Sequence, residues 1–177
     1  MIKKRKKDPK LNKKRGNAWE GKLAKDLSEW IFSDCNVLKR HPSSGAEKSV
    51  YSGDIFPMKQ ISWKCFPFHI EAKTGYEKNA HPFGATKQIL SWYSSAYEKI
   101  NKSNFESNIW IIWKIPNKGN LFCIDYELKT INSKFKIQTD INNNQIFVYE
   151  LNDVIKLDFY NISEIHRKEI ICEIIND

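Results

Sequence analysis

The run of residues 109–115, Ile-Trp-Ile-Ile-Trp-Lys-Ile, limits the possible folds of this chain more than any other segment. Its apolar residues do not alternate with polar ones, which is typical of a strand covered on both faces. Such a strand belongs inside a sheet with other layers on each side, so the run indicates a layered domain. The uninterrupted stretch 109–113 is five residues long, far below the roughly 20 that a membrane-spanning helix needs.

Apolar residues recur at helical spacing in segments 17–32 and 85–100, which are therefore predicted to be amphipathic helices. Asn17 is a candidate N-cap of the first helix, and Glu20, three residues later, stands in the position of a capping box. Extended segments are expected at 35–40, 60–64, 66–73, 109–115 and 121–126. This order predicts an α/β fold with a mixed β-sheet flanked by helices.

The C-terminal region is predicted to extend this core. Residues 142–144 indicate a turn between hairpin strands at 135–139 and 145–151. Ser163 is a candidate cap for a last helix that ends near residue 175. We therefore expect a core over about 16–126 and a β-hairpin and helix extension over about 127–177, both within a single domain at 16–177.

Positive charge is concentrated at the start of the chain. Residues 1–15 carry nine basic side chains and one acid, Asp8, so their net charge of +8 equals that of the whole chain. A segment this rich in charge and poor in apolar residues is expected to be a disordered arm when isolated. Such an arm attracts nucleic-acid phosphates without reading sequence. A solubility tail or a nuclear address would explain the same composition.

The cysteines and the N-terminus indicate the compartment. Four cysteines lie far apart without a C-x-x-C pair, which argues against a zinc knuckle and suits a reducing compartment: Cys35, Cys65, Cys123 and Cys172. The chain starts with charged residues, so a secretory signal peptide is not expected. We expect a soluble, intracellular protein.

The strongest chemical signal is Ile70-Glu71-Ala72-Lys73, at the end of the extended segment 66–73. Because side chains alternate along a strand, Glu71 and Lys73 should share one face with His69, while Ile70 and Ala72 point into the core. Asp54 follows Ser52-Gly53, 17 residues before Glu71, where a tight turn could bring its carboxylate close. Two carboxylates form an oxygen-rich site for Mg²⁺. A neighbouring lysine can orient a water molecule and stabilise charge on a phosphate.

Each part of this pattern also has a structural explanation. An E-x-K pair on a strand is more often a solvated ion pair, and a Gly-Asp is usually a turn. Glu20 is explained equally well by the capping box. Lys87 and Lys99 either line a DNA face or keep a helix soluble. Trp110, Trp113, Phe122 and Tyr126 suit core packing better than base stacking, and no Gly-rich phosphate loop occurs.

The order of these motifs resembles the PD-(D/E)xK nuclease superfamily, which has the restriction-endonuclease-like fold. The likeness covers about residues 13–125 and includes the Gln-bearing helix that follows the E-x-K strand. Within the superfamily the chain is similar to Holliday junction resolvases. Arg15-Gly-Asn-Ala-Trp-Glu20 resembles the opening of the RecU type, and Arg40-His-Pro-Ser-Ser-Gly45 resembles a stretch of the archaeal type. Gly53-Asp54 replaces the usual Pro-Asp, and the long interval to Glu71 implies a larger hairpin.

The resemblance implies a role for individual residues. Asp54 and Glu71 would be metal ligands, and Glu20 an auxiliary acid at the metal. Lys73 would be the catalytic lysine, and Gln88 would assist in the active site. Mg²⁺ is the implied cofactor, with Mn²⁺ as a substitute. DNA contacts are expected from Lys13, Lys14, Arg15, Arg40, Ser43, Ser44 and Lys87.

Three functions are open at this point. The first is a homodimeric, Mg²⁺-dependent endonuclease that cleaves four-way DNA junctions in recombination and repair, because two equivalent sites suit paired cuts. The second is another nuclease of the superfamily, of restriction or repair type, acting on duplex or single-stranded DNA. The third is a non-catalytic DNA-binding protein, against which the complete set of Asp54, Glu71 and Lys73 argues. We expect a cytoplasmic, nucleoid-associated protein of bacterial or phage origin, not bound to a membrane.

Overall fold

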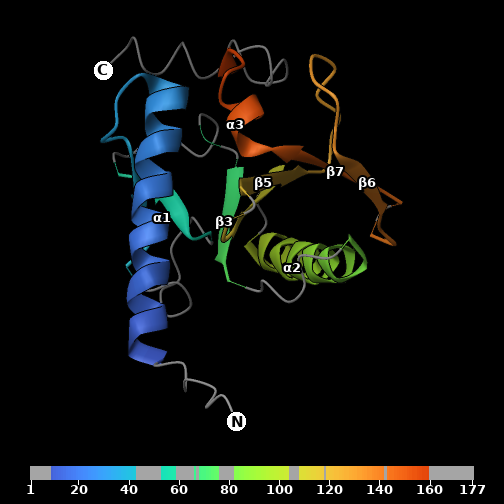
Figure 1. Ribbon diagram of the computed structural model, residues 1–177, viewed down its shortest axis with the longest axis horizontal. Helices are drawn as coiled ribbons and strands as arrows, with labels where there is room; N and C mark the ends of the chain where they lie inside the picture. The colour runs from blue at the N-terminus through green and yellow to red at the C-terminus, as the bar shows by residue number, and fades with distance from the viewer. Residues whose placement is uncertain are drawn as a thin grey trace.

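The computed structural model describes residues 9–42, 53–58, 66, 68–75, 82–103, 108–117, 119–141 and 143–159 (Figure 1). Three helices lie in these segments: α1 (Pro9–Phe32), α2 (Pro82–Ser103) and α3 (Leu151–Val154). They accompany seven strands: β1 (Leu38–Arg40), β2 (Ile55–Pro57), β3 (Phe68–Thr74), β4 (Asn108–Ile115), β5 (Gly119–Ile124), β6 (Phe135–Gln138) and β7 (Gln145–Glu150).

All seven strands form one mixed sheet in the order β1-β2-β3-β4-β5-β7-β6. β3 and β4 are parallel, with Glu71 opposite Ile111 and Lys73 opposite Trp113, whereas the other neighbouring pairs are antiparallel. A parallel pair needs a long connection, which α2 supplies between these two strands. The predicted α/β fold, with its restriction-endonuclease-like mixed sheet flanked by helices, is confirmed.

The sheet separates two apolar clusters, as expected for a central strand buried on both sides. Trp110 and Ile112 of β4 point towards α1 and α3, where they join the cluster around Leu23 and Leu27. Ile109, Ile111, Trp113 and Ile115 point the other way and pack with α2. Figure 1 shows α1 and α2 on different sides of β3 and β5. The run 109–115 is thus buried between helices, as its composition predicted, with only Lys114 exposed.

The start of α1 differs from the expectation. The helix begins at Pro9, not at Asn17, so Asn17 lies inside it and is not an N-cap. The capping-box explanation of Glu20 is therefore wrong, because that role exists only at a helix start. Residues 9–15, assigned to the basic arm, form the first turns of α1, and residues 1–8 lie outside the described segments.

The predicted C-terminal hairpin is present. β6 and β7 pair antiparallel, and Asn143 adopts a φ of 55° in the turn that joins them. β7 also pairs with β5, so the extension continues the same sheet. The strand expected at 60–64 and the helix expected after Ser163 fall outside the described residues. No described helix is both long enough and apolar enough to span a membrane.

Candidate active site

The candidate site lies where β2 begins beside β3. Phe68, Ile70 and Ala72 of β3 enter the cluster beneath α1, so the intervening side chains of β3 take the opposite face. Glu71 is 3% exposed although it carries a carboxylate. A charge at this depth needs opposite charges or hydrogen bonds around it, and its contacts therefore reveal what this part of the sheet is built to hold.

Asp54 is positioned by contacts to two neighbouring strands. Its backbone N–H donates to the Ile70 carbonyl at 2.7 Å, and its own carbonyl accepts from the His41 N–H at 2.8 Å. Its side-chain Oδ2 accepts from the Ala72 N–H at 2.9 Å. A Cβ at Gly53 would stand 2.7 Å from the Ile70 oxygen, so only glycine lets the chain approach β3 this closely. Asp54 is therefore held rigidly before any ligand binds.

Lys73 joins the two acids. Its Nζ lies 3.5 Å from Oδ2 of Asp54 and donates to Oε2 of Glu71. The carboxylates of Asp54 and Glu71, 17 residues apart in sequence, are consequently within reach of one ammonium group. The structure thus brings together the three residues that the motif analysis singled out.

The second oxygen of Glu71 also has partners. His69 Nε2 lies 2.9 Å from Oε1, and because a carboxylate only accepts, the imidazole donates. Lys99, on α2, donates to the same oxygen at 2.5 Å. Sequence reasoning did not place Lys99 in the site, because it lies 28 residues after Glu71 and no local pattern links them. Its position eleven residues after Gln88, three helical turns along the same face of α2, was the one available signal.

Burial acts to raise the pKa of both Asp54 and Glu71, but the neighbouring groups leave the two pKa values shifted in opposite directions. Burial alone would raise the pKa of Glu71, yet the hydrogen bond from His69 and the charge of Lys73 lower that pKa below its ordinary value. For Asp54, burial and the negative charge of Glu71 raise the pKa, against the effect of Lys73. Burial lowers the pKa of Lys73, but the two carboxylates outweigh this and raise it. Glu71 is thus a stable negative charge, whereas Asp54 gains from any further cation.

Glu20 and Arg40 lie beside this group. Arg40 Nη1 is 3.7 Å from Glu20 Oε2, and also donates to the His41 carbonyl at 3.1 Å. Burial and the charge of Asp54 raise the pKa of Glu20, while Arg40 lowers it. A Cβ at Gly16 would lie 3.9 Å from both Glu20 Oε1 and Thr74 Cγ2, so Glu20 lies near the end of β3.

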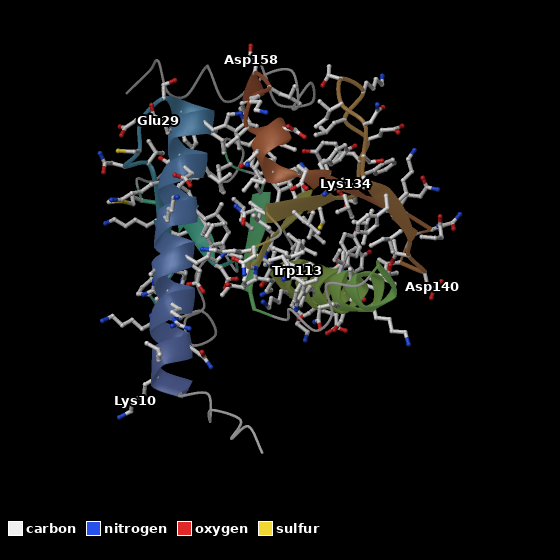
Figure 2. The ribbon with its side chains drawn as sticks, viewed as in Figure 1. Lys10, Glu29, Trp113, Lys134, Asp140 and Asp158 are labelled. Carbon is white, nitrogen blue, oxygen red and sulfur yellow. The ribbon has the colours of Figure 1, made fainter. Side chains whose placement is uncertain are left out.

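The remaining predicted residues are spread over the surface. Lys13, Lys14 and Arg15 are exposed on the first turns of α1, and Lys87 is exposed on α2. Gln88 is half-buried on α2. Lys10, at the free end of α1, is labelled in Figure 2. Ser43 and Ser44 lie outside the described residues.

Comparison with known proteins agrees with this geometry. The model of a family described as "Phage putative PDDEXK endonuclease" matches residues 11–172. The chain belongs to this family. Comparisons with curated proteins and with solved structures gave no match. Membership makes the protein an endonuclease of the PD-(D/E)xK superfamily with DNA as its substrate. Nucleases of this superfamily generally use divalent metals.

The donor set of the endonuclease fits a hard divalent cation. Asp54 and Glu71 both supply a carboxylate oxygen near Lys73 Nζ. Burial, and then the negative charge of Glu71, raise the pKa of Asp54, and a cation beside the two acids would offset both effects. Within the described segments no group of three or more His, Cys, Asp or Glu is placed to hold a metal. Mg²⁺ does not require one, because it keeps several waters and binds through one or two carboxylates together with substrate phosphate.

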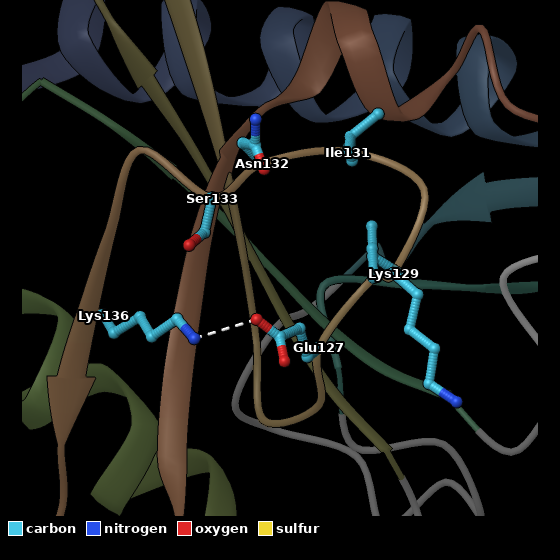
Figure 3. A pocket seen from close by; sticks show the side chains of 7 residues that line it. Glu127, Lys129, Ile131, Asn132, Ser133 and Lys136 are labelled. Carbon is cyan, nitrogen blue, oxygen red and sulfur yellow. Dashed lines mark hydrogen bonds and ion pairs between the residues drawn. The ribbon is translucent and has the colours of Figure 1, made fainter.

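A separate open hollow of about 560 Å³ lies against the loop after β5 (Figure 3). Glu127, Leu128, Lys129 and Ser133 are among the residues that line it, and Lys136 spans part of it with an ion pair to Glu127 at 2.8 Å. It has one carboxylate, already paired, and thus lacks the two converging acids found beside β3. The hollow therefore offers fewer ligands for a divalent cation than the acids beside β3.

Proposed function

We propose that this endonuclease cleaves DNA with an active site formed by Asp54, Glu71 and Lys73. The observation that carries the proposal is the convergence of both carboxylates on Lys73 Nζ, 3.5 Å from Asp54 Oδ2 and in contact with Glu71 Oε2. One carboxylate is enough to form an ion pair with Lys73. A second buried carboxylate adds a desolvation penalty of roughly several kcal/mol, so an ion pair formed only for stability would not include it.

The residues divide the chemistry between them. Asp54 and Glu71 would hold Mg²⁺, or Mn²⁺ in its place, which when bound activates water and neutralises charge on the phosphate. Lys73 orients the attacking water and stabilises negative charge that develops on the phosphate oxygens. Glu20 is proposed as an auxiliary acid and Gln88 as a helper on α2.

The N-terminal turns of α1 are proposed to bind DNA beside this site. A Cβ at Gly16 would lie 3.9 Å from Thr74, the last residue of β3, so α1 passes the end of the strand at this point. The seven residues before it add about 10 Å of helix. Figure 1 shows this end of α1 projecting past the end of β3. Lys13 lies seven residues, or two turns, before Glu20 and hence on the same face of the helix. Lys14, Arg15, Arg40 and Lys87 are proposed as further phosphate contacts, together with Ser43 and Ser44.

This surface favours contact with the DNA backbone. Residues 10–15 provide basic side chains and no aromatic ring. Over the described part of the chain, the exposed large apolar side chains are Leu11 and Met58, and neither is aromatic. Sequence-tolerant binding of single strands usually depends on bases stacked on aromatic side chains. The surface therefore supports recognition of duplex arms through phosphates, which is not sequence-specific.

Four-way junctions are the proposed substrate, because duplex arms bound through their phosphates would be recognised by shape. A homodimer would supply the two sites needed for paired cuts. We further propose that residues 16–177 form a single domain, and that the basic segment before it, whose residues 9–15 continue α1, serves as an arm that binds DNA. The protein would act in recombination or repair, in the cytoplasm of a bacterial or phage-infected cell and close to the nucleoid.

The test is cleavage of a labelled four-way junction and of its linear arms, with Mg²⁺ and with chelator. Asp54→Asn and Lys73→Ala are compared with Lys25→Ala, which removes an exposed lysine from the outer side of α1. The proposal expects paired nicks at the junction that need Mg²⁺, are lost in the first two variants and persist in the third. Equal cleavage of linear DNA would reject junction specificity and leave a duplex nuclease. DNA binding without cleavage under any divalent metal would reject the active site.

A further inference from the structure

Glu71 is contacted by two lysines from different elements. Lys73 reaches Oε2 from the same strand, and Lys99 reaches Oε1 at 2.5 Å from α2. The two side chains differ in exposure, at 22% for Lys73 and 45% for Lys99. One buried carboxylate thus holds two ammonium groups, one of which extends from the solvent-exposed side of a helix.

Lys99 is not needed to orient Glu71. His69 already donates to the same oxygen at 2.9 Å, and its imidazole is 2% exposed and therefore fixed by packing. Lys73 holds the other oxygen. A carboxylate that is held at both oxygens by side chains of its own strand gains little orientation from a half-exposed lysine on a different element.

Charge counting gives Lys99 a different role. Asp54 and Glu71 carry two negative charges, which Lys73 and Lys99 balance. Glu20 and Arg40 balance each other. A divalent cation between the two acids would leave two positive charges in excess, and ammonium groups beside it would be repelled. Among the described residues Lys73 also forms an ion pair with Asp54, whereas the ion pair of Lys99 is with Glu71, and Asp54 acts on Lys99 only from farther away.

We propose that Lys99 is a counter-ion of Glu71 in the free protein and moves to a DNA phosphate when a divalent cation occupies the two carboxylates. This inference rests on the proposed active site. Lysine suits the role because its ammonium is a compact charge on a flexible four-carbon chain. The exchange keeps Glu71 neutralised when the cation is absent, and provides a phosphate contact when the site is loaded.

The first measurement is Mn²⁺ binding in the absence of DNA. The electron paramagnetic resonance signal of free Mn²⁺ reports how much of the metal is unbound. Lys99→Met removes the competing charge and is expected to bind Mn²⁺ about three- to tenfold more tightly than the wild type, the scale of one partly exposed charge next to the site. Lys102→Met is the matched control, because Lys102 is exposed on the last turn of the same helix. It is expected to leave Mn²⁺ affinity unchanged.

The second measurement is binding of the labelled junction with Ca²⁺ and with chelator at several salt concentrations. With Ca²⁺, Lys99→Met should weaken binding and reduce the slope of log K against log salt by about 1, the loss of one phosphate contact. With chelator it should match the wild type, because Lys99 then occupies Glu71. Lys99→Arg keeps the charge and should retain the Ca²⁺-dependent part of the affinity.

Weaker or unchanged Mn²⁺ binding by Lys99→Met would overturn the proposal, and would make Lys99 a residue that supports Glu71. An equal loss of DNA affinity with Ca²⁺ and with chelator would also overturn it, because Lys99 would then contact DNA permanently. Failure of the proposed active site is distinguishable, since the wild type itself would then bind no Mn²⁺. Thermal unfolding of each variant separates these results from a loss of fold.

Discussion

Glu71 and Asp125 both contact side chains of α2, and they differ in what surrounds them. Glu71, on β3, has His69, Lys73 and Lys99 at its oxygens, and its pKa is lowered. Asp125, after β5, accepts a hydrogen bond from the Tyr93 hydroxyl at 2.9 Å, and burial raises its pKa despite that bond.

The difference teaches that burial does not identify a functional acid. Removal from water raises the pKa of either carboxyl, and a neutral hydroxyl does not compensate for it at Asp125. At Glu71 the hydrogen bond from His69 and the charges of Lys73, on the same strand, and Lys99, on α2, outweigh burial and lower the pKa. Of these two acids, Glu71 is the one whose surroundings keep a negative charge in a buried position, which the proposed metal site requires.

The largest expected effect is on the rate of junction cleavage, which should fall when Glu71 is replaced but not when Asp125 is replaced. Glu71→Gln is expected to slow junction cleavage by at least about 100-fold, because it removes a charge that stabilises the reaction. Asp125→Asn, the matched loss of a carboxylate outside the site, should stay within about twofold of the wild type. Single-turnover rates measure both. A similar loss in the two variants would remove the distinction between the regions.

The geometry beside β3 can be disturbed without removing a charge. Gly53→Ala would place a Cβ 2.7 Å from the Ile70 oxygen and 2.9 Å from the Ile70 nitrogen, so the backbone before Asp54 must shift. We expect a loss of about 1–3 kcal/mol in the free energy of unfolding, together with slower cleavage.

Gly21→Ala is the control for this substitution. Nothing lies within 4 Å of the added methyl group, and Gly21 is inside α1, so the variant should gain about 0.5–1 kcal/mol. Urea unfolding of both variants is the measurement. A stable and fully active Gly53→Ala variant would show that the close approach to β3 does not position Asp54.

Acid should weaken the contribution of Glu71. A carboxyl whose pKa is lower in the folded than in the unfolded state stabilises the fold above the unfolded value, near 4.3 for ordinary glutamate, and this contribution is lost as the pH falls further. At pH 7 Glu71→Gln should be less stable than the wild type, because Lys73 and Lys99 then lose the charge of their shared partner. Denaturant unfolding at pH 7, 5, 4 and 3 should show the gap narrowing below about pH 4. A gap that does not change with pH would contradict the lowered pKa.

Replacing Asp125 should change the free energy of unfolding least, and its dependence on pH should be opposite to that of Glu71. Its pKa is raised by folding, so its favourable contribution is complete at low pH and is lost as the pH rises through the folded value. Asp125→Asn keeps an oxygen for the Tyr93 hydroxyl and removes the buried charge. At pH 7 the variant should equal or exceed the wild type by less than about 1 kcal/mol in denaturant unfolding, an advantage that disappears in acid. Clear destabilisation at pH 7 would show that Asp125 has a cationic partner.

Local patterns in the sequence predicted most of the fold. The two long helices, the hairpin of β6 and β7, and the burial of β4 on both sides follow from the spacing of apolar residues, which depends only on helix and strand geometry. The start of α1 was predicted eight residues too late. Its first turns are rich in lysine, which favours helix, and they continue a helix that is already docked through Leu23 and Leu27.

The candidate site divides in the same way. Alternation along β3 was sufficient to place His69, Glu71 and Lys73 on one face, because the period of a strand is a local property. The position of Asp54 depended on backbone hydrogen bonds between β2 and β3, and the reach of Lys99 to Glu71 depended on how α2 packs on the sheet. Contacts between residues far apart in sequence follow from packing, which has no period that can be read along the chain. The sequence by itself therefore determined the fold class and the residue types of the site, whereas only the tertiary structure decided which charges meet at Glu71.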